Sequence, residues 1–235
     1  MQWELLMRSP VGAPRDLEFC SLSEPEYGRN GAMNDPKYSS PLSAQLTKRW
    51  FVLRHGRSEA NEKGVVASQL INAEAAYGLT DVGRAEVEKS VQDEVATLQD
   101  GSPLLILMSP FLRTRQTAEI AGEILGLQAE TDDRLVERDF GDYELLSDEH
   151  YDEVWDVDPK NPDAVPGRAE TVYQVVKRVT DLVLEVEGNP DIRTCLLVTH
   201  CDVAMILSCA FQDADPRYHR SRDPIKTGEL RRLIQ

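Results

Sequence analysis

Two arginines and two histidines in this sequence each follow a short apolar run. Arg54 and His55 come directly after residues 51–53, Arg113 lies a few positions after residues 104–108, and His200 comes directly after residues 195–199. Arginine binds anions through a rigid, permanently charged fork of donors, and histidine can act as a nucleophile or as a donor. Four potentially cationic groups repel one another unless an anion lies between them. The pattern therefore predicts an anion site, with phosphate as the obvious ligand.

Elements of two kinds must position these side chains. Short apolar runs are typical of buried parallel strands, whose carboxyl ends open onto one edge of a sheet. Near-helical spacing of valine and leucine predicts a helix from about residue 79 to 98 with Thr80 as its N-cap, and another over residues 170–187. A last helix, over residues 202–211, follows His200.

One further helix is expected between the second strand and Gly126. Ser109 is predicted as its N-cap and Pro110 as its first helical residue. Strands that alternate with helices predict an α/β fold, a three-layer α/β/α arrangement with a mostly parallel central sheet. At 235 residues, one catalytic domain is expected over residues 49–235. Residues 1–48 hold five prolines and no sustained period, which indicates an irregular N-terminal extension.

Five motifs follow one another in the chain. They are RHGRSEAN at residues 54–61, LTDVG at 79–83, SPFLRTRQTA at 109–118, LVERDFG at 135–141 and LVTH at 197–200. Together they resemble, in the same order, the motifs of the histidine phosphatase superfamily, in the cytosolic branch related to cofactor-dependent phosphoglycerate mutases. The resemblance covers most of the chain except its two ends, and it is weaker at Arg168 and Ala169, which separate an expected glycine and glutamate.

The resemblance implies a role for each matching residue. His55 would attack phosphorus and carry the phosphoryl group, while Arg54 and Arg113 clamp its oxygens and His200 supplies another donor. Glu137 would protonate the leaving oxygen and later take a proton from water, which works best with a raised pKa. Ser58, Asn61 and Arg57 are candidate substrate-binding residues, although a surface ion pair also explains Arg57, as it does Arg115.

Two kinds of residue depart from this pattern or lack support in it. Cys201 follows the second histidine where the family commonly has glycine, and we expect it to narrow the pocket and tune the choice of substrate. His150 and His219 have no supporting motif, so both are expected at the surface.

The charge distribution bears on the substrate. A net charge of −15 argues against a nucleic-acid partner. Between residues 130 and 170 the sequence has fifteen acidic residues and only four basic ones. This segment predicts a small acidic cap, which disfavours a substrate with two anionic groups. Hydrolysis of a small phosphomonoester is therefore preferred to mutase-type phosphoryl transfer. A phosphate-binding scaffold with little turnover is the alternative of another class.

The remaining expectations concern compartment and partners. Cysteines at positions 20, 195, 201 and 209 show no paired spacing, which favours a reducing, cytoplasmic location. No apolar run is long enough to cross a membrane, and no metal-ligand spacing accompanies the motifs, so neither membrane, metal nor cofactor is expected. The expected partner is a small phosphorylated substrate, and an oligomer is possible.

Overall fold

A five-stranded sheet forms the centre of the computed structural model, which describes residues 38–42 and 46–233. The strands are β1 (Arg49–Arg54), β2 (Leu104–Met108), β3 (Ala129–Thr131), β4 (Thr194–Thr199) and β5 (Leu230–Leu233), in the order β3-β2-β4-β1-β5. The first four are parallel, and β5 pairs antiparallel with β1. The predicted mostly parallel α/β fold is thus confirmed. Most of the expected N-terminal extension, with Cys20, lies outside the described residues.

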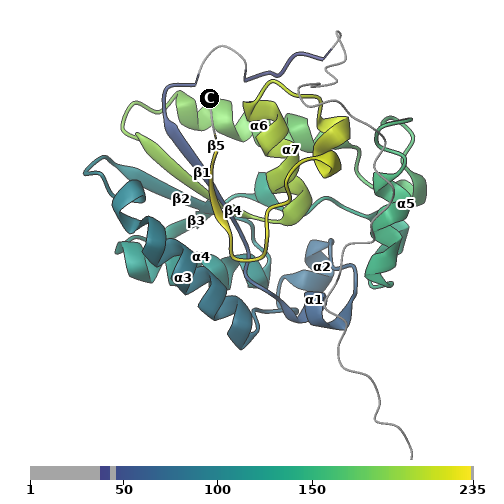
Figure 1. Cartoon of the computed structure of the whole chain (residues 1–235), viewed down its shortest axis with the longest axis horizontal. Coiled ribbons are helices and arrows are strands. Elements are labelled where there is room, and N and C mark those ends of the chain that lie inside the picture. The colour runs from purple at the N-terminus through teal and green to yellow at the C-terminus, as the bar shows by residue number, and fades with distance from the viewer. Residues whose placement is uncertain (1–37, 43–45, 234–235) are drawn as a thin grey trace, which may run out of the picture. The chain divides into compact units, whose positions relative to one another are not determined.

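Long helices cover both faces of the sheet. Figure 1 shows α3 (Asp81–Leu98) and α4 (Leu112–Leu125) on one face and α6 (Val172–Glu187) and α7 (Cys201–Phe211) on the other. Each pair packs on the sheet through its own apolar core. Every predicted inward position of α6 is buried, namely Val172, Val175, Val176, Val179, Leu182, Val183 and Val186. No described helix has the length and apolar character needed to span a bilayer.

The starts of two helices test the sequence predictions directly. Thr80 caps α3 as predicted, because its side chain accepts a hydrogen bond from the backbone of Gly83. The predicted start of α4 is wrong: the helix begins at Leu112, with Phe111 as its N-cap. The physical reason is that the backbone N–H of Ser109 bonds to Val198 at 3.0 Å, so that the chain is still paired with β4 there.

Short elements gather beyond one end of the sheet. They are α1 (Glu59–Lys63), α2 (Leu70–Ala73), α5 (Tyr151–Trp155) and the 3₁₀ helices η1 (Asp133–Leu135), η2 (Gly141–Tyr143), η3 (Asp148–His150), η4 (Pro166–Arg168) and η5 (Pro216–Ser221). Several of them pack around Val66, Phe140, Val154 and Ala169. Figure 1 shows α1, α2 and α5 beside the end of the sheet that the strand β1 points to. We call the segment from η2 to η4 the cap.

Two glycines hold the loop after β1 against the first turn of α3. A Cβ atom on Gly56 would lie 2.2 Å from the carbonyl oxygen of Gly83, and one on Gly83 would lie 2.1 Å from that of Arg57. Backbone atoms cannot move away from such a contact without shifting the whole segment. The close approach therefore fixes the loop that carries His55 and Arg57.

Gly83→Ala is expected to lower the free energy of unfolding by about 1–3 kcal/mol, because the added methyl group overpacks a backbone contact. Denaturant unfolding monitored by circular dichroism measures the change. Arg84→Ala, at an exposed position in the same helical turn, is the matched control and should change stability by less than about 0.5 kcal/mol. Equal stability of the two variants would contradict the prediction.

Candidate functional site

The ends of three strands bring two histidines and an arginine together in the interior. The backbone N–H of His55 extends the pairing of β1 with β4 by a 3.0 Å bond to Thr199, so that the rings of His55 and His200 meet with centroids 5.3 Å apart. Arg113, in the first turn of α4, donates from Nε to Nε2 of His55 at 3.2 Å. All three side chains are buried. The predicted meeting of these residues at one edge of the sheet is what the structure shows.

His55 is held as a neutral imidazole whose Nε2 is unprotonated. Its Nδ1 lies 2.8 Å from the carbonyl oxygen of Gly56, an acceptor only, so Nδ1 carries the proton. Nε2 then accepts from Arg113. Burial, followed by the positive charges of Arg113 and Arg54, holds the pKa of His55 well below its usual value. The lone pair of Nε2 is therefore present at neutral pH.

Three buried nitrogens in this cluster have no hydrogen-bond partner among the described residues: Nε of Arg54, Nη1 of Arg113 and Nδ1 of His200. Other atoms of the same arginines are occupied, since Nη1 of Arg54 donates to Ile225 at 2.8 Å and Nη2 of Arg113 donates to Ala67 at 2.9 Å. An unpaired buried donor costs about 1–3 kcal/mol, so folded proteins rarely keep several side by side without a ligand. The arrangement fits a bound anion.

The Glu137 carboxyl group interacts electrostatically with Arg113 and Arg54 of this cluster. Burial raises the pKa of Glu137 to about 7, and the negative charge of Asp202 adds to the increase. Arg113, the backbone N–H of Arg138 and Arg54 act in the opposite direction without cancelling it. The carboxyl group is thus protonated in part of the molecules at neutral pH, as a group that both gives and takes a proton requires.

The structure does not bring all candidate substrate-binding residues into the cluster. Ser58 is buried and caps α1, and the side-chain oxygen of Asn61 accepts at 3.0 Å from both the backbone N–H and the hydroxyl of Ser58. Arg57 is exposed and lies 3.7 Å from Glu62. Asn61 and Arg57 thus have local partners, and a surface ion pair accounts for Arg57.

Two residues of the motif at residues 109–118, Ser109 and Phe111, contact His200 in a way that the sequence analysis did not anticipate. The Ser109 hydroxyl lies 2.8 Å from Nε2 of His200, and the ring of Phe111 packs edge-on against His200 with centroids 4.9 Å apart. The Arg113 guanidinium lies over the same Phe111 ring. Because Ser109 was interpreted as a helix cap, its contact with His200 was not predicted.

A pocket of about 530 Å³ adjoins the cluster and shares Phe111 and Glu137 with it. Both arginines of its lining are paired with carboxylates. Arg178 bonds to Glu170 at 2.8 Å, and Arg168 bonds to Asp142, which lies outside the pocket. Asp139 adds a further carboxylate to the lining. The remaining lining is formed by Ser68, Gln69, Leu70, Val136, Ala169 and Gln174. The pocket therefore offers mixed polar contacts and no surplus of positive charge.

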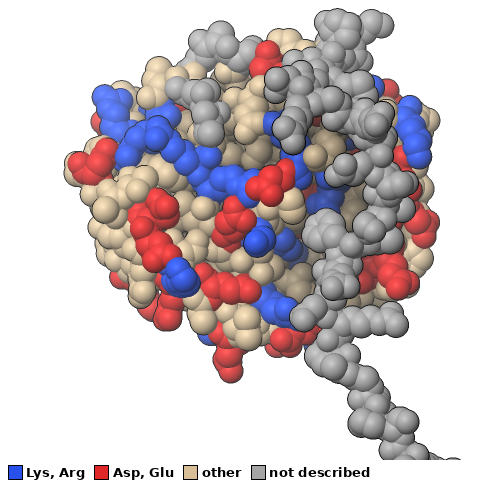
Figure 2. Space-filling model, in the orientation of Figure 1, with Lys and Arg blue, Asp and Glu red and all other residues tan. Residues whose placement is uncertain are grey.

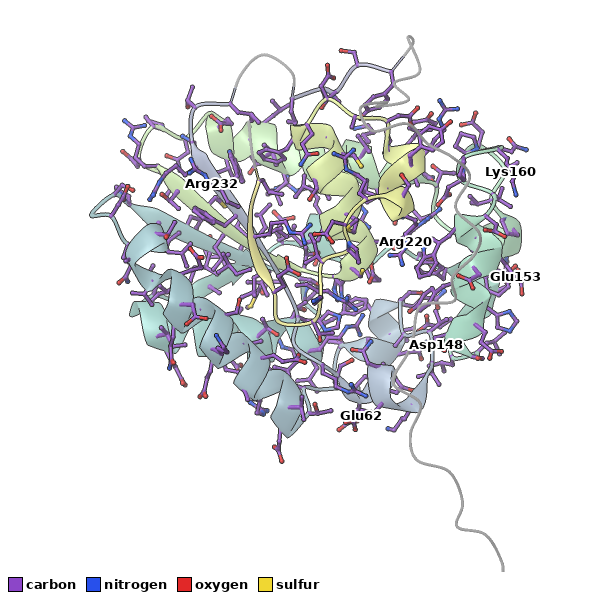
Figure 3. The ribbon with its side chains drawn as sticks, viewed as in Figure 1. Glu62, Asp148, Glu153, Lys160, Arg220 and Arg232 are labelled. Carbon is purple, nitrogen blue, oxygen red and sulfur yellow. The ribbon has the colours of Figure 1, made fainter. Side chains whose placement is uncertain are left out.

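The acidic side chains of the cap turn mostly to solvent. Of the eight carboxylates between Asp142 and Asp158, six are exposed, whereas Glu144 bonds to Ser68 and Asp158 is buried against Arg138. Figure 3 shows Glu153 on α5, at the outer side of the cap. On the face seen in Figure 2, acidic and basic side chains are interspersed, and a basic band crosses the upper half. The acidity of the segment does not by itself set the charge of the pocket.

The two histidines expected at the surface differ. His150 is partly exposed and pairs with Glu153 at 2.6 Å. The prediction for His219 is wrong: its side chain is fully buried, with Nε2 3.6 Å from Asp202. Cys201 is half-buried, with Sγ 3.6 Å from Nη1 of Arg220. In the part of the chain that the structure describes, no three candidate ligand side chains group as a metal site would need.

Comparisons with known proteins agree with this geometry. The model of the histidine phosphatase superfamily (branch 1) matches residues 50–233. A protein of Hydrogenobacter thermophilus named "Putative phosphoserine phosphatase 2" is 28% identical over 170 residues, which cover 69% of this chain and 77% of the relative. The "Uncharacterized phosphatase PhoE" of Bacillus subtilis is 25% identical over 172 residues, covering 73% of this chain and 81% of the relative.

Solved structures show the same fold. The mycobacterial glucosyl-3-phosphoglycerate phosphatase in its complex with VO3 superposes with a TM-score of 0.65 at 24% identity, covering 80% of this chain and 98% of that chain. YhfR of Bacillus stearothermophilus superposes with a TM-score of 0.64 at 22% identity, covering 78% and 89%.

Inorganic phosphate is expected to stabilise the protein against heat, because it would satisfy the unpaired nitrogens. At a concentration 100 times the dissociation constant, the gain is about 2.7 kcal/mol. Arg113→Gln should abolish the stabilisation. Arg115→Gln is the matched control on the same helix, since that side chain is occupied by the carbonyl oxygens of Pro110 and Glu74. Differential scanning calorimetry tests this, and loss of the shift in both variants would contradict the assignment to Arg113.

Proposed function

Since the chain belongs to the histidine phosphatase superfamily, we propose that it hydrolyses a small phosphomonoester through a phosphohistidine intermediate on His55. The observation that carries the proposal is the set of unpaired buried nitrogens on Arg54, Arg113 and His200 around a neutral His55. Three unpaired buried donors beside the unprotonated Nε2 of His55 supply what phosphoryl transfer needs.

The first step forms the phosphohistidine. The lone pair on Nε2 of His55 attacks phosphorus, and the bond between phosphorus and the leaving oxygen breaks with its electron pair on oxygen. Glu137 gives its proton to that oxygen, so the alcohol leaves neutral. Arg54 and Arg113 balance the charge of the phosphoryl oxygens throughout. In this assignment the Ser109 hydroxyl donates to Nε2 of His200, which leaves the Nδ1 proton of His200 free for the phosphoryl group.

The second step returns the enzyme to its starting state. A water molecule attacks the phosphorus, and the ionised Glu137 takes its proton. The bond between phosphorus and His55 then breaks, and the electron pair returns to Nε2. Because Glu137 gives a proton in one step and accepts one in the next, a pKa of about 7 suits both directions. The arginines supply the positive charge, so the proposed reaction needs no metal ion or cofactor.

The adjoining pocket is the proposed site of the alcohol. Its arginines, Arg168 and Arg178, are both paired with carboxylates, and Asp139 adds negative charge. The substrate proposed from this lining is a polar monophosphate whose remaining part is neutral or cationic. We place the protein in the reducing cytoplasm, since Cys195, Cys201 and Cys209 are free thiols.

Mutase-type transfer is the runner-up, because it needs cations for a second anionic group. Three basic residues are held by carboxylates: Arg134 pairs with Asp132 and Glu185, Arg138 with Asp158, and Arg217 with Asp215. A scaffold without turnover would not need an acid in the position of Glu137.

A trapping experiment separates these functions. The protein is incubated with p-nitrophenyl phosphate labelled in its phosphoryl group, quenched in alkali and digested. Alkali-stable, acid-labile label on the peptide with His55, together with release of free phosphate, is the expected result. Transfer of the label only to a phosphoglycerate acceptor would indicate a mutase. Absence of both label and turnover would leave only the scaffold, and His55→Ala is the control for the labelled position.

Glu137→Gln is expected to lower kcat for an alkyl phosphate by about 10²–10⁴, because the leaving alkoxide then lacks its acid. The loss in forming phosphohistidine should be smaller with p-nitrophenyl phosphate, whose leaving group is stable without a proton. Label should therefore accumulate on His55 in this variant. Equal losses with both substrates in single-turnover experiments would move the acid role to another residue.

The value of kcat/KM is expected to fall as the pH rises through about 7, because Glu137 must be protonated in the first step. The raised pKa also means that the folded protein binds the Glu137 proton more tightly than the unfolded chain does. Its contribution to the free energy of unfolding is therefore present below pH 4.5, the usual pKa, and lost as the pH rises through about 7. Glu137→Gln should remove this dependence, which unfolding at several pH values measures.

A further inference from the structure

A fully buried carboxylate, Asp202, lies in the first turn of α7, two residues after His200. Its Oδ2 atom accepts from Nε1 of Trp155 at 2.9 Å and lies 3.4 Å from Nη1 of Arg138. Nε2 of His219 is 3.6 Å from the same oxygen, and Nη1 of Arg220 is 3.6 Å from Oδ1. This one side chain thus joins α7 to α5, to η5 and to the loop that carries Glu137.

Asp202 remains charged in this environment. Burial alone would raise the pKa of Asp202, but the contacts with His219, Arg220 and Arg138 outweigh burial and hold that pKa below its usual value. Arg138 is already engaged by Asp158, which accepts from both of its terminal nitrogens at 2.7 and 2.8 Å. Arg138 therefore compensates Asp202 only in part, and a negative charge persists at the start of α7.

Arg138 connects Asp202 with Glu137. The backbone N–H of Arg138 donates to Oε1 of Glu137 at 2.9 Å, while the side chain of Arg138 touches Asp202. Like-charge repulsion from Asp202 opposes ionisation of Glu137. The other groups that interact with Glu137 are Arg113 from α4, Arg54 from the end of β1 and Tyr151 from α5. The carboxylate of Asp202 thus raises the cost of a charge on Glu137.

We propose that Asp202 is a positioning residue for the general acid: its fixed charge, held by Trp155, Arg138 and the η5 residues, keeps the proton on Glu137 until the leaving oxygen takes it. The inference rests on the proposed function of Glu137. It assigns Asp202 no direct contact with substrate, because an ionised carboxylate that accepts from Trp155 has no proton to give. Arg220 partly compensates the Asp202 charge, because its Nη1 lies 3.6 Å from Oδ1 of Asp202. The Arg220 guanidinium also stacks on Trp155, 3.7 Å from the ring centroid. Figure 3 shows Arg220 between the sheet and α5.

Two substitutions with opposite expected signs test the inference. Asp202→Asn keeps an acceptor for Trp155 but removes the charge, so the midpoint of the basic limb of kcat/KM should move down by roughly one pH unit. Above the midpoint, kcat/KM then falls about tenfold, with little change at acidic pH. Arg220→Gln removes a compensating cation, so the midpoint should move up. Because Arg220 is partly exposed, Arg220→Gln is expected to fold, and its midpoint tests the inference even if Asp202→Asn does not fold.

A matched control distinguishes the charge from general damage. Asp215→Asn neutralises another buried carboxylate paired with an arginine, the N-cap of η5, where asparagine also caps, and should leave the midpoint within about 0.2 pH units. Trp155→Phe removes the hydrogen bond to Asp202 and keeps the charge, so it should lower thermal stability without the downward shift. A merely structural role for Asp202 would give the same midpoint in Asp202→Asn as in the wild type.

A readout without turnover separates this inference from the proposed function. NMR titration of isotope-labelled glutamate carboxyls, with the Glu137 signal assigned by its absence in Glu137→Gln, gives the pKa of Glu137 directly. A lower value in Asp202→Asn and a higher one in Arg220→Gln support the inference. An unchanged value in both overturns it. If these shifts occur but the wild type neither turns over nor labels His55, the proposed function fails and the electrostatic link stands.

Discussion

The structure depends on the burial of Arg113 beside two neutral histidines. No described carboxylate lies within ion-pair distance of its guanidinium, which is fully enclosed and contacts His55 and the backbone of Ala67. Burial lowers the pKa of Arg113, with Glu137 acting in the opposite direction. A charge desolvated in this way costs several kcal/mol unless an anion compensates it. The rest of the site holds the Arg113 charge in place. In the proposed reaction, the phosphoryl group of the substrate is the anion that compensates this charge.

Three features of the fold hold that arrangement. The parallel pairing of β1 with β4 continues one residue past the strands, so His55 is fixed relative to the segment that carries His200. The contact between Gly56 and Gly83 prevents the loop after β1 from moving away from α3. On the opposite side, Asp202 and Arg138 connect the start of α7 to the segment that carries Glu137. The groups that must stay neutral and those that must stay charged therefore lie on helices or on loops that these contacts hold in place.

Much of this was accessible from the sequence, because long periodic segments and strand-end residues carry strong signals. Such signals predict the Thr80 cap, the inward face of α6 and the meeting of His55, Arg113 and His200. The start of α4 was predicted wrongly, since local preference at Ser109 yields to its pairing with β4. His219 and Trp155 could not be linked to Asp202, because short 3₁₀ and one-turn helices have no period from which facing residues can be deduced.

The cap shows why charge counted along the sequence differs from charge at a site. Its carboxylates dominate the composition between residues 130 and 170, yet six of the eight from Asp142 to Asp158 face solvent, where counterions screen them. The pocket instead contains the pair of Glu170 with Arg178, which is nearly neutral at a distance, and Asp139. A second phosphate would meet no unpaired cation in that lining, whereas a hydroxyl or ammonium group would meet acceptors. The proposed preference for a monophosphate thus rests on which charges are paired, and among the outer carboxylates it depends on Asp142, because Asp142 pairs with Arg168 of the pocket lining.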